Sequence, residues 1–530
     1  MRRPVSAPRS DKPALPPLEG LERMVGAITL SVGTFMTILD TSVTNVSVPT
    51  ISGDLGISPT QGTWIITSYA VAIGISLPLT GWLTTRFGQV RLFLASVMLF
   101  TATSLLCGLA TSIESMVVFR VMQGVVAGPM VPLSQSLLMS TFPREKAGFA
   151  LALWSMTALV APVSGPLIGG WISEQSTWPW IFYVNVPIGI IVATLTWRIY
   201  RLRDSPTRKL PVDLAGIVLL AIWVGALQIM LDKGKELDWF ASSEIVALAC
   251  VAAGGFALFL AWELLDNPHP VVDLSLFTLR NFWTGTAAQS IGYAIFFGTM
   301  VVMPLWLQTL MGYTPTWSGM MLAPVGLLSI LIAPILGRRV HERDPRPTVT
   351  LAFLIFAGVS FARAGFDLDA DPWTIVLPTI LQGAASVLFF MPLTSLLLSG
   401  LPPERVPSAA GLSNFVRYSA GAFGASVSIT LWDERTALHR AHLVEHATAY
   451  DPGAGAALEQ VQALGYTPDQ ALGLLDRAIE AQARMMGTND LFWLAGMLFL
   501  CLAVLIWIAR RPARPGAAAT IPASRQEASR

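Results

Sequence analysis

The sequence predicts an all-α, polytopic membrane protein, and its composition and its apolar segments are the evidence. Of its 530 residues, 53% are hydrophobic and only 13% are charged, and the mean hydropathy is +0.60. Soluble globular proteins carry charge on about a quarter of their residues. The chain also breaks repeatedly into apolar segments of about 18 residues or more, the length that crosses roughly 30 Å of hydrocarbon.

Fourteen such segments are expected along the chain. They cover residues 25–49, 62–83, 92–111, 115–138, 148–172, 180–200, 212–231, 244–264, 283–307, 317–338, 347–364, 374–398, 405–432 and 489–509. With a cytoplasmic N-terminus, most of the 34 Lys and Arg residues fall in the cytoplasmic tails and connections. The positive-inside rule therefore predicts that both termini are cytoplasmic. In this assignment Arg363 is counted on the outer side, at the end of the span 347–364, whereas Arg120 and Arg417 lie deeper within spans.

The two ends of the chain repeat one another. The stretch RVMQGVVAGPMVPLSQSLL, from Arg120, is echoed by TILQGAASVLFFMPLTSLLL, from Thr379. The spacing exceeds the length of six spans, which leaves two further spans between the halves and predicts a 6 + 2 + 6 arrangement. Because Arg120 aligns with Thr379, the second half lacks this charge at the equivalent position. Repeated halves around a midplane site are typical of transporters.

This arrangement divides the chain into five parts. They are a cytoplasmic tail 1–24, a six-helix bundle 25–200, two linker helices 212–264, a six-helix bundle 283–509 with a periplasmic loop 433–488, and a cytoplasmic tail 510–530.

Asp40 stands inside the first span, in ILDTSVTNVSVP. A carboxylate there costs about 2.5–3.5 kcal/mol on insertion scales. At 1.5 Å per residue, Asp40 lies about 13 Å and Arg120 about 9 Å below the outer ends of their helices, within reach of one another. The pair could be a structural ion pair that fixes helix packing, or a proton switch in which burial and a nearby cation oppose one another.

Four motifs carry a resemblance to a known family. They are LDTSVTNVSVP in the first span, GWLTTRFGQVR in the following loop, RVMQG in the fourth span and APVSGPLIGGWI in the fifth. Together they resemble the major facilitator superfamily, and within it the fourteen-span drug:proton antiporters of the EmrB/QacA type. The resemblance implies a proton-driven efflux permease of the bacterial inner membrane that exports hydrophobic toxic compounds, with Asp40 and Arg120 as coupling residues.

The resemblance also assigns roles to two glycine-rich motifs. In the fifth span it implies a seal against proton leak, although tight helix packing alone would also explain small residues there. The residues of this antiporter motif are Pro162, Gly165, Pro166, Gly169 and Gly170. In the loop after the second span it implies a conformational element made of Gly81, Arg86, Gly88 and Arg91. The family usually has an acid where this chain has Thr85, so a latch that uses that acid is not expected here.

A wall of the substrate cavity is expected from aromatic, polarizable and polar residues within spans. The candidates are Met36, Asn45, Trp64, Trp154, Tyr293, Phe296, Asn414 and Arg417. Each of them could instead face lipid or serve packing. Arg417 could meet an anionic group of a substrate or satisfy carbonyls in a packed interface.

The segment between the last two spans is the only large piece outside the membrane. Thr467, Pro468 and Gln470 predict a capped helix there. The resemblance implies that this segment docks a periplasmic membrane-fusion adaptor of the EmrA type, which leads to an outer-membrane channel. The alternative is a dedicated metabolite or siderophore exporter that acts without an adaptor.

Several other classes of function are not expected. The chain has no G-x-x-x-x-G-K-[ST] loop for ATP, so the proton gradient is the expected energy source and no cofactor is expected. His439, His442 and His446 share a helix face, but no cysteine or carboxylate cluster joins them, so we expect no metal. An enzyme would need convergent acid, base or metal groups, and a sensor a soluble signalling domain. No nucleic-acid partner is expected.

Overall fold

The computed structural model describes residues 18–143, 147–208, 211–265, 270–339, 344–445 and 452–509. Within these residues the regular structure is helical throughout. The first part contains α1 (Gly20–Asp54), α2 (Pro59–Gly62), α3 (Trp64–Ser76), α4 (Thr80–Phe87), α5 (Gln89–Gly108), α6 (Ile113–Thr141), α7 (Ala147–Gln175), α8 (Trp180–Tyr183) and α9 (Asn185–Tyr200). Then come α10 (Leu214–Lys233) and α11 (Ser243–Leu264). The last part contains α12 (Arg280–Thr309), α13 (Pro315–Leu322), α14 (Val325–Arg339), α15 (Pro345–Arg363), α16 (Pro372–Leu397), α17 (Val406–Glu445), α18 (Pro452–Ala463) and α19 (Pro468–Leu505).

Eleven helical segments of the described chain are long and apolar enough to cross a membrane, or twelve if the bent pair α3 and α4 is one span. The predicted all-helical class is therefore confirmed. Two predicted spans are broken rather than continuous. The break between α3 and α4 turns the chain by 62° at Pro78, and α13 is separated from α14 at Pro324. A proline inside a helix removes a backbone donor and bends the axis.

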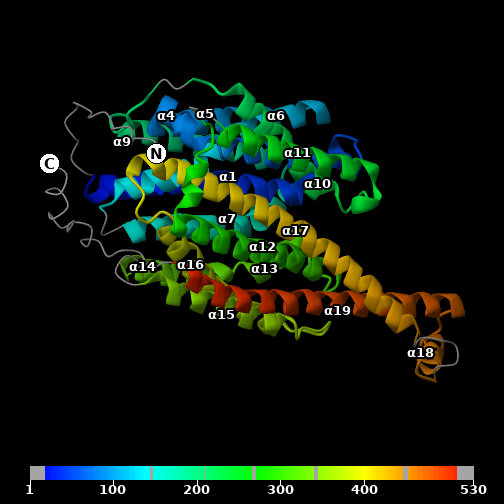
Figure 1. Cartoon of the computed structure of the whole chain (residues 1–530). Helices are drawn as coiled ribbons and strands as arrows, with labels where there is room; N and C mark the ends of the chain where they lie inside the picture. Colours follow the sequence, from blue (N-terminus) through cyan, green and yellow to red (C-terminus); the bar gives the residue numbers. More distant parts are fainter. Residues whose placement is uncertain are drawn as a thin grey trace, which may run out of the picture.

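The helices pack as two groups (Figure 1). In the first group α1 packs against α6, α7 and α9, and α5 packs against α6 and α9. In the second group α12 packs against α16 and α17, and α15 packs against α16 and α19. The groups meet where α7 contacts α13, α14 and α16, and where α17 contacts α4 and α6. In Figure 1, α1 begins and α19 ends at the same end of the bundle, opposite α18.

The helices α10 and α11 lie against both groups. Gly74 of α3 packs on Val224 of α10, and Trp223 of α10 meets Phe415 of α17 with ring centroids 5.7 Å apart. Beyond α10, Lys235 forms an ion pair with Asp433 of α17. The pair α10 and α11 is thus anchored on α3 and on α17.

The predicted loop 433–488 is largely helical. Two helices of 40 and 38 residues, α17 and α19, run through its two ends and extend beyond the rest of the bundle, with α18 at their tip (Figure 1). At 1.5 Å per residue each is about 60 Å long, twice the hydrocarbon thickness. Trp432 donates to the hydroxyl of Thr488 at 2.9 Å, which holds the two helices together. The predicted cap of α19 is confirmed, because Thr467 and Gln470 bond one another's backbone amides at 3.3 and 2.9 Å.

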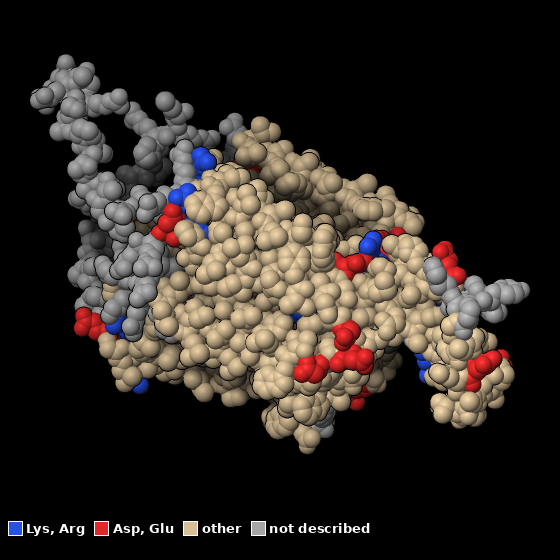
Figure 2. All heavy atoms as spheres, turned by 90° about the horizontal axis from the view of Figure 1, so that it is seen from below, with Lys and Arg blue, Asp and Glu red and all other residues tan. Residues whose placement is uncertain are grey.

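The surface is apolar around the middle of the bundle. Figure 2 shows a broad belt with almost no Lys, Arg, Asp or Glu between charged groups near the two ends. Large apolar side chains are exposed on the helices, among them Met98, Ile190 and Trp197. Exposed apolar area on this scale marks a surface that faces lipid.

Candidate proton-coupling site

Asp40 and Arg120 form an ion pair inside the first helix group. Nη1 of Arg120, on α6, lies 2.6 Å from Oδ2 of Asp40, on α1, and neither side chain has any exposed surface. The sequence predicted that the two depths allow this contact. Both charges are removed from water, so the pair is stable only if the remaining lone pairs and protons also find partners.

The other oxygen of Asp40 is bound by two amides. Nδ2 of Asn185, at the start of α9, donates to Oδ1 at 2.8 Å, and Nε2 of Gln123 donates to the same oxygen at 3.2 Å. Both amides also donate to the hydroxyl of Ser104 on α5, at 3.3 and 2.7 Å. Four helices therefore converge on one carboxylate: α1, α5, α6 and α9.

Arg120 has further contacts in addition to its ion pair with Asp40. Its Nε donates to the carbonyl of Ile65 at 3.1 Å, and Nη1 also donates to Oε1 of Gln123 at 2.7 Å. The guanidinium lies 3.9 Å from the ring centroid of Tyr69. Its Nη2 is buried with no hydrogen-bond partner among the described residues. The planar group is thus fixed on three sides, and one donor is left over.

The arrangement determines what protonation of Asp40 would do. As a carboxylate it accepts one charge-assisted bond and two amide bonds, and protonation would remove the charge that these bonds favour. Gaining a proton would therefore loosen the contacts of α1 with α6 and α9, and losing it would restore them. Asp40 is only 2% exposed, so in this conformation the site is closed to water and exchange requires the helices to move.

The glycines of the antiporter motif lie against the residues that follow Asp40. A Cβ at Gly165 would collide with Ser42, and one at Gly169 would press on Val43 at 3.0 Å. At Gly170 a Cβ would meet only Oγ1 of Thr316, at an ordinary 3.5 Å. Gly165 and Gly169 therefore let α7 approach α1 beside the ion pair. The side chains of Pro162 and Pro166 lie outside the described residues.

The loop motif ties α5 to the segment after α9. Gly88 has a left-handed φ of +92°, and a Cβ there would collide with the carboxylate of Asp204 at 2.5–2.6 Å. Asp204 accepts from the amide of Val90 at 2.9 Å and lies 3.3 Å from Nε of Arg91. Asp204 is thus the acid that this motif binds.

The other members of the loop motif lie around α4. A Cβ at Gly81 would come within 2.8 Å of Cα of Ser408, so α4 packs closely on α17. Arg86 lies over the ring of Trp82 at 5.4 Å. The hydroxyl of Thr85 donates to the carbonyl of Gly81 at 3.0 Å.

Five of the eight cavity candidates come together where α7 meets the second group. Arg417 lies 4.8 Å from the ring of Tyr293 and 5.9 Å from that of Trp154, and it donates to Oδ1 of Asn414 at 2.6 Å. Phe296 lies next to Tyr293, with centroids 6.2 Å apart. Asn414 donates to Gln135 of α6 at 3.2 Å, which bridges the two groups.

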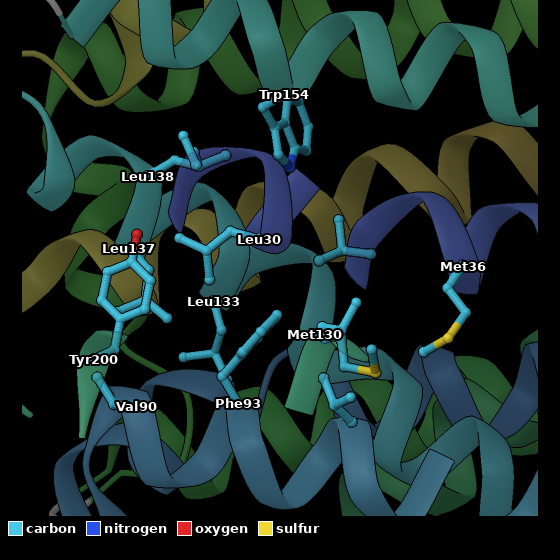
Figure 3. Packing of buried hydrophobic residues seen from close by; sticks show 14 of the residues in the cluster. Leu30, Met36, Val90, Phe93, Met130, Leu133, Leu137, Leu138, Trp154 and Tyr200 are labelled. Atoms are coloured by element: carbon cyan, nitrogen blue, oxygen red, sulfur yellow. The ribbon is translucent and has the colours of Figure 1, made fainter. Parts of the chain in front are cut away.

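The other three candidates do not share this wall. Met36 is fully buried in a packed cluster of the first group, and Figure 3 shows its side chain away from the indole of Trp154. Asn45 is exposed, and Trp64 is 39% exposed beside Lys233. The structure does not group these three with the other five, because residue type does not reveal which face of a helix turns inward.

Arg363 was counted among the outer charges, and it is a buried residue. It is only 3% exposed at the end of α15. The second half has no arginine at the position aligned with Arg120, but Arg363 donates to Thr379, which holds that position, at 3.1 Å and to Gln382 at 2.7 Å. The arginine comes from a neighbouring helix rather than from the position aligned with Arg120, so the sequence repeat did not reveal it.

The histidines of the outer segment are partly engaged. Nε2 of His439 lies 2.7 Å from Oδ2 of Asp490, which also bonds Arg435. Within the described ranges, no group of three or more His, Cys, Asp or Glu is arranged to hold a metal ion. His446 lies outside the described residues.

Comparison with known proteins decides the family. The model of the Major Facilitator Superfamily matches residues 30–425. The chain belongs to the major facilitator superfamily. Members of this superfamily are secondary transporters, so the chain is a multi-pass transporter of the bacterial inner membrane rather than an enzyme.

Two curated relatives of this superfamily member are similar over almost the whole chain. Multidrug export protein EmrB of Escherichia coli (strain K12) is 46% identical over 501 residues, which cover 94% of this chain and 97% of that protein. Fatty acid resistance protein FarB of Neisseria gonorrhoeae is 44% identical over 501 residues, which cover 94% and 99%. The predicted resemblance to EmrB-type transporters is confirmed.

Solved structures of major facilitator proteins share the fold at low identity. The proton:xylose symporter XylE aligns with a TM-score of 0.59 and 12% identity, over 92% of this chain and 95% of that one. The human organic anion transporter MFSD10 (TETRAN) aligns with a TM-score of 0.58 and 13% identity, over 92% and 100%. These two similarities concern the fold alone.

Proposed function

We propose that this transporter is a proton-driven multidrug efflux permease that exports hydrophobic toxic compounds across the inner membrane. The observation that carries the proposal is the buried carboxylate of Asp40, bonded to Arg120, Asn185 and Gln123. Because a charged residue in a span is costly to insert, it is expected to have a function in the transport cycle. The 46% identity to EmrB supports multidrug compounds as the cargo.

In the proposed topology the chain crosses the membrane fourteen times, as six, two and six spans, with both termini cytoplasmic. The long helices α7 and α17 are added to the twelve segments that qualify by hydropathy when α3 and α4 count as one span. The five-part division of the chain goes with this topology. Its periplasmic part is then the paired ends of α17 and α19 together with α18.

The transporter is further proposed to act in a tripartite system, with a periplasmic membrane-fusion adaptor and an outer-membrane channel. The support is the length of α17 and α19 beyond the bundle (Figure 1). A cavity of about 430 Å³ opens between these extensions, lined by residues that include Arg440, Arg484 and Glu480. Leu472 and Leu464 are exposed nearby, at 53% and 78%. This surface offers apolar and charged groups to a partner.

Transport in reconstituted vesicles tests the energy source. We expect a hydrophobic dye to be transported when a pH gradient is imposed without ATP, and transport to stop when a protonophore collapses the gradient. A matched experiment with a sodium gradient is the control. Dye transport of equal rate without any proton gradient would contradict proton coupling.

A further inference from the structure

Arg363 is a buried cation without a buried anion. It is 3% exposed, and among the described residues no carboxylate lies within ion-pair distance of it, in contrast to Arg120 with Asp40. Its two acceptors, Thr379 and Gln382, are neutral. Its Nε is buried and has no hydrogen-bond partner. An isolated charge in an apolar interior is costly unless it is neutralised or fully bonded.

The other contacts of Arg363 compensate only in part. Its position in the last turn of α15 is favourable, because the helix dipole is negative there. One aromatic ring, that of Phe492, lies 5.7 Å from its guanidinium. Arg417, another buried arginine with no carboxylate within ion-pair distance among the described residues, lies closer to two rings, at 4.8 and 4.7 Å from Tyr293 and Tyr418. Arg363 therefore has the larger unmet demand for negative charge.

A small cavity adjoins this arginine. It measures about 20 Å³ and is lined by Met300, Met303, Leu322, Val325, Arg363, Thr379 and Gln382. A space of about 10–15 Å³ on the same measure holds one water molecule. The cavity is thus large enough for one water or one halide ion and too small for an organic anion. Its polar lining groups come from Arg363, Thr379 and Gln382, and the rest is apolar.

We propose that this cavity is a binding site for a single small inorganic anion, with chloride as the physiological occupant. The anion would neutralise Arg363 and accept from the Nε that has no partner. It would tie together α12, α13, α14, α15 and α16, which supply the lining. The site lies in the second helix group, apart from Asp40, so its failure would leave the proposed proton coupling unaffected.

The test is the thermal unfolding midpoint of the purified full-length protein in detergent. Sodium chloride is exchanged for sodium gluconate at constant ionic strength, since gluconate is too large for the cavity. We expect the midpoint to rise with the logarithm of chloride concentration, as it does for a ligand that binds only the folded state. Sodium bromide should act like chloride. Equal midpoints in chloride and gluconate would overturn the proposal.

Two variants locate the effect. Arg363→Met removes the charge at similar length, so it should lose the chloride response and be at least as stable as the wild type in gluconate. If that variant does not fold, Leu322→Phe fills the cavity and leaves Arg363 in place, and it should also lose the response. The control is Arg405→Gln, which alters a surface arginine paired with Asp273 and should respond like the wild type. A full chloride response in Arg363→Met or in Leu322→Phe would place the anion elsewhere and refute the assignment.

Discussion

Gln382 of α16 accepts a 2.7 Å hydrogen bond from Arg363 of α15. The aligned glutamine of the first half, Gln123, also accepts from a buried arginine at 2.7 Å, but that arginine is Arg120 of its own helix. Both halves therefore bury a guanidinium against an equivalent glutamine. Among the described residues only the first half supplies a carboxylate to it. In the part of the chain that the structure describes, a carboxylate that can gain and lose a proton lies beside this guanidinium in the first half only, which supports the proposal that proton coupling takes place there.

Replacing Arg120 by lysine should impair export strongly. Lysine keeps the charge but cannot bond Ile65, Asp40 and Gln123 at once from a planar group over Tyr69. Losing one hydrogen bond to a charged group costs about 1.5–3 kcal/mol, so we expect at least about a tenfold loss of transport rate. The measurement is dye efflux from cells at equal protein level. Wild-type efflux in Arg120→Lys would make the arginine a simple counter-charge.

Asn185→Leu should weaken export because it removes a hydrogen bond to the carboxylate of Asp40. The change removes the 2.8 Å amide bond to the carboxylate and the 3.3 Å bond to Ser104, while the ion pair with Arg120 stays. We expect a severalfold lower rate in vesicles under a fixed pH gradient. Thr194→Val, an exposed position on the same helix, is the control. If the two variants transport equally well, the amide is not part of the coupling site.

Gly165→Ala should be far more damaging than Gly170→Ala. The new methyl group at Gly165 collides with Ser42, whereas at Gly170 it makes an ordinary contact of 3.5 Å with Thr316. Overpacking costs about 1–3 kcal/mol, and it would push α7 away from α1 beside Asp40. Proton leak into vesicles and the thermal midpoint are the two readouts. If both variants show the same proton leak and the same thermal midpoint, the close contact of α1 with α7 is not important for the seal or for stability.

Deleting about residues 441–483 and joining the ends with a short Gly/Ser linker should separate pumping from assembly. The join is short, because Thr436 and Gly487 are in contact across α17 and α19. We expect dye transport in vesicles to survive, and whole-cell resistance and adaptor co-purification to be lost. Arg440→Gln in the full-length chain is a milder control that loses the Asp476 ion pair. Adaptor binding that persists after the deletion would place the docking site elsewhere.

The sequence could predict the main coupling pair but not its full environment. Asp40 and Arg120 are conspicuous because ionised groups are costly in an apolar span, and helix rise alone places them at similar depth. Asn185 and Ser104 are neutral, and a single amide or hydroxyl in a span gives little signal; the lone Asn in YVNVPIG was the available hint. Asp204, which binds the loop at Val90 and Arg91, lies more than a hundred residues from it in the sequence.

Arg363 shows why burial could not be read from hydropathy. It is the last residue of α15 and precedes a segment with three aspartates, Asp367, Asp369 and Asp371, so its surroundings in the sequence look aqueous. Only the packing of α15 against α16 determines that its long side chain turns inward. The interruptions at Pro78 and Pro324 coincide with prolines, which are visible in the sequence.

The central claim is that Asp40 carries the proton, and the most direct test is proton movement coupled to export. Asp40→Asn alone leaves Arg120 buried and unpaired, which costs about 3–5 kcal/mol. The double variant Asp40→Asn with Arg120→Gln removes both charges and should restore the amount of folded protein. Glu244→Gln, an exposed acid at the start of α11, is the matched control.

The measurement is proton flux across vesicles, followed with an internal pH dye, after a hydrophobic substrate is added. In the wild type and in Glu244→Gln, protons should cross the membrane in the direction opposite to the substrate. Asp40→Asn and the double variant should show no substrate-dependent proton flux, although both are folded in the membrane. Substrate-dependent proton flux at the wild-type rate in folded Asp40→Asn would contradict the account.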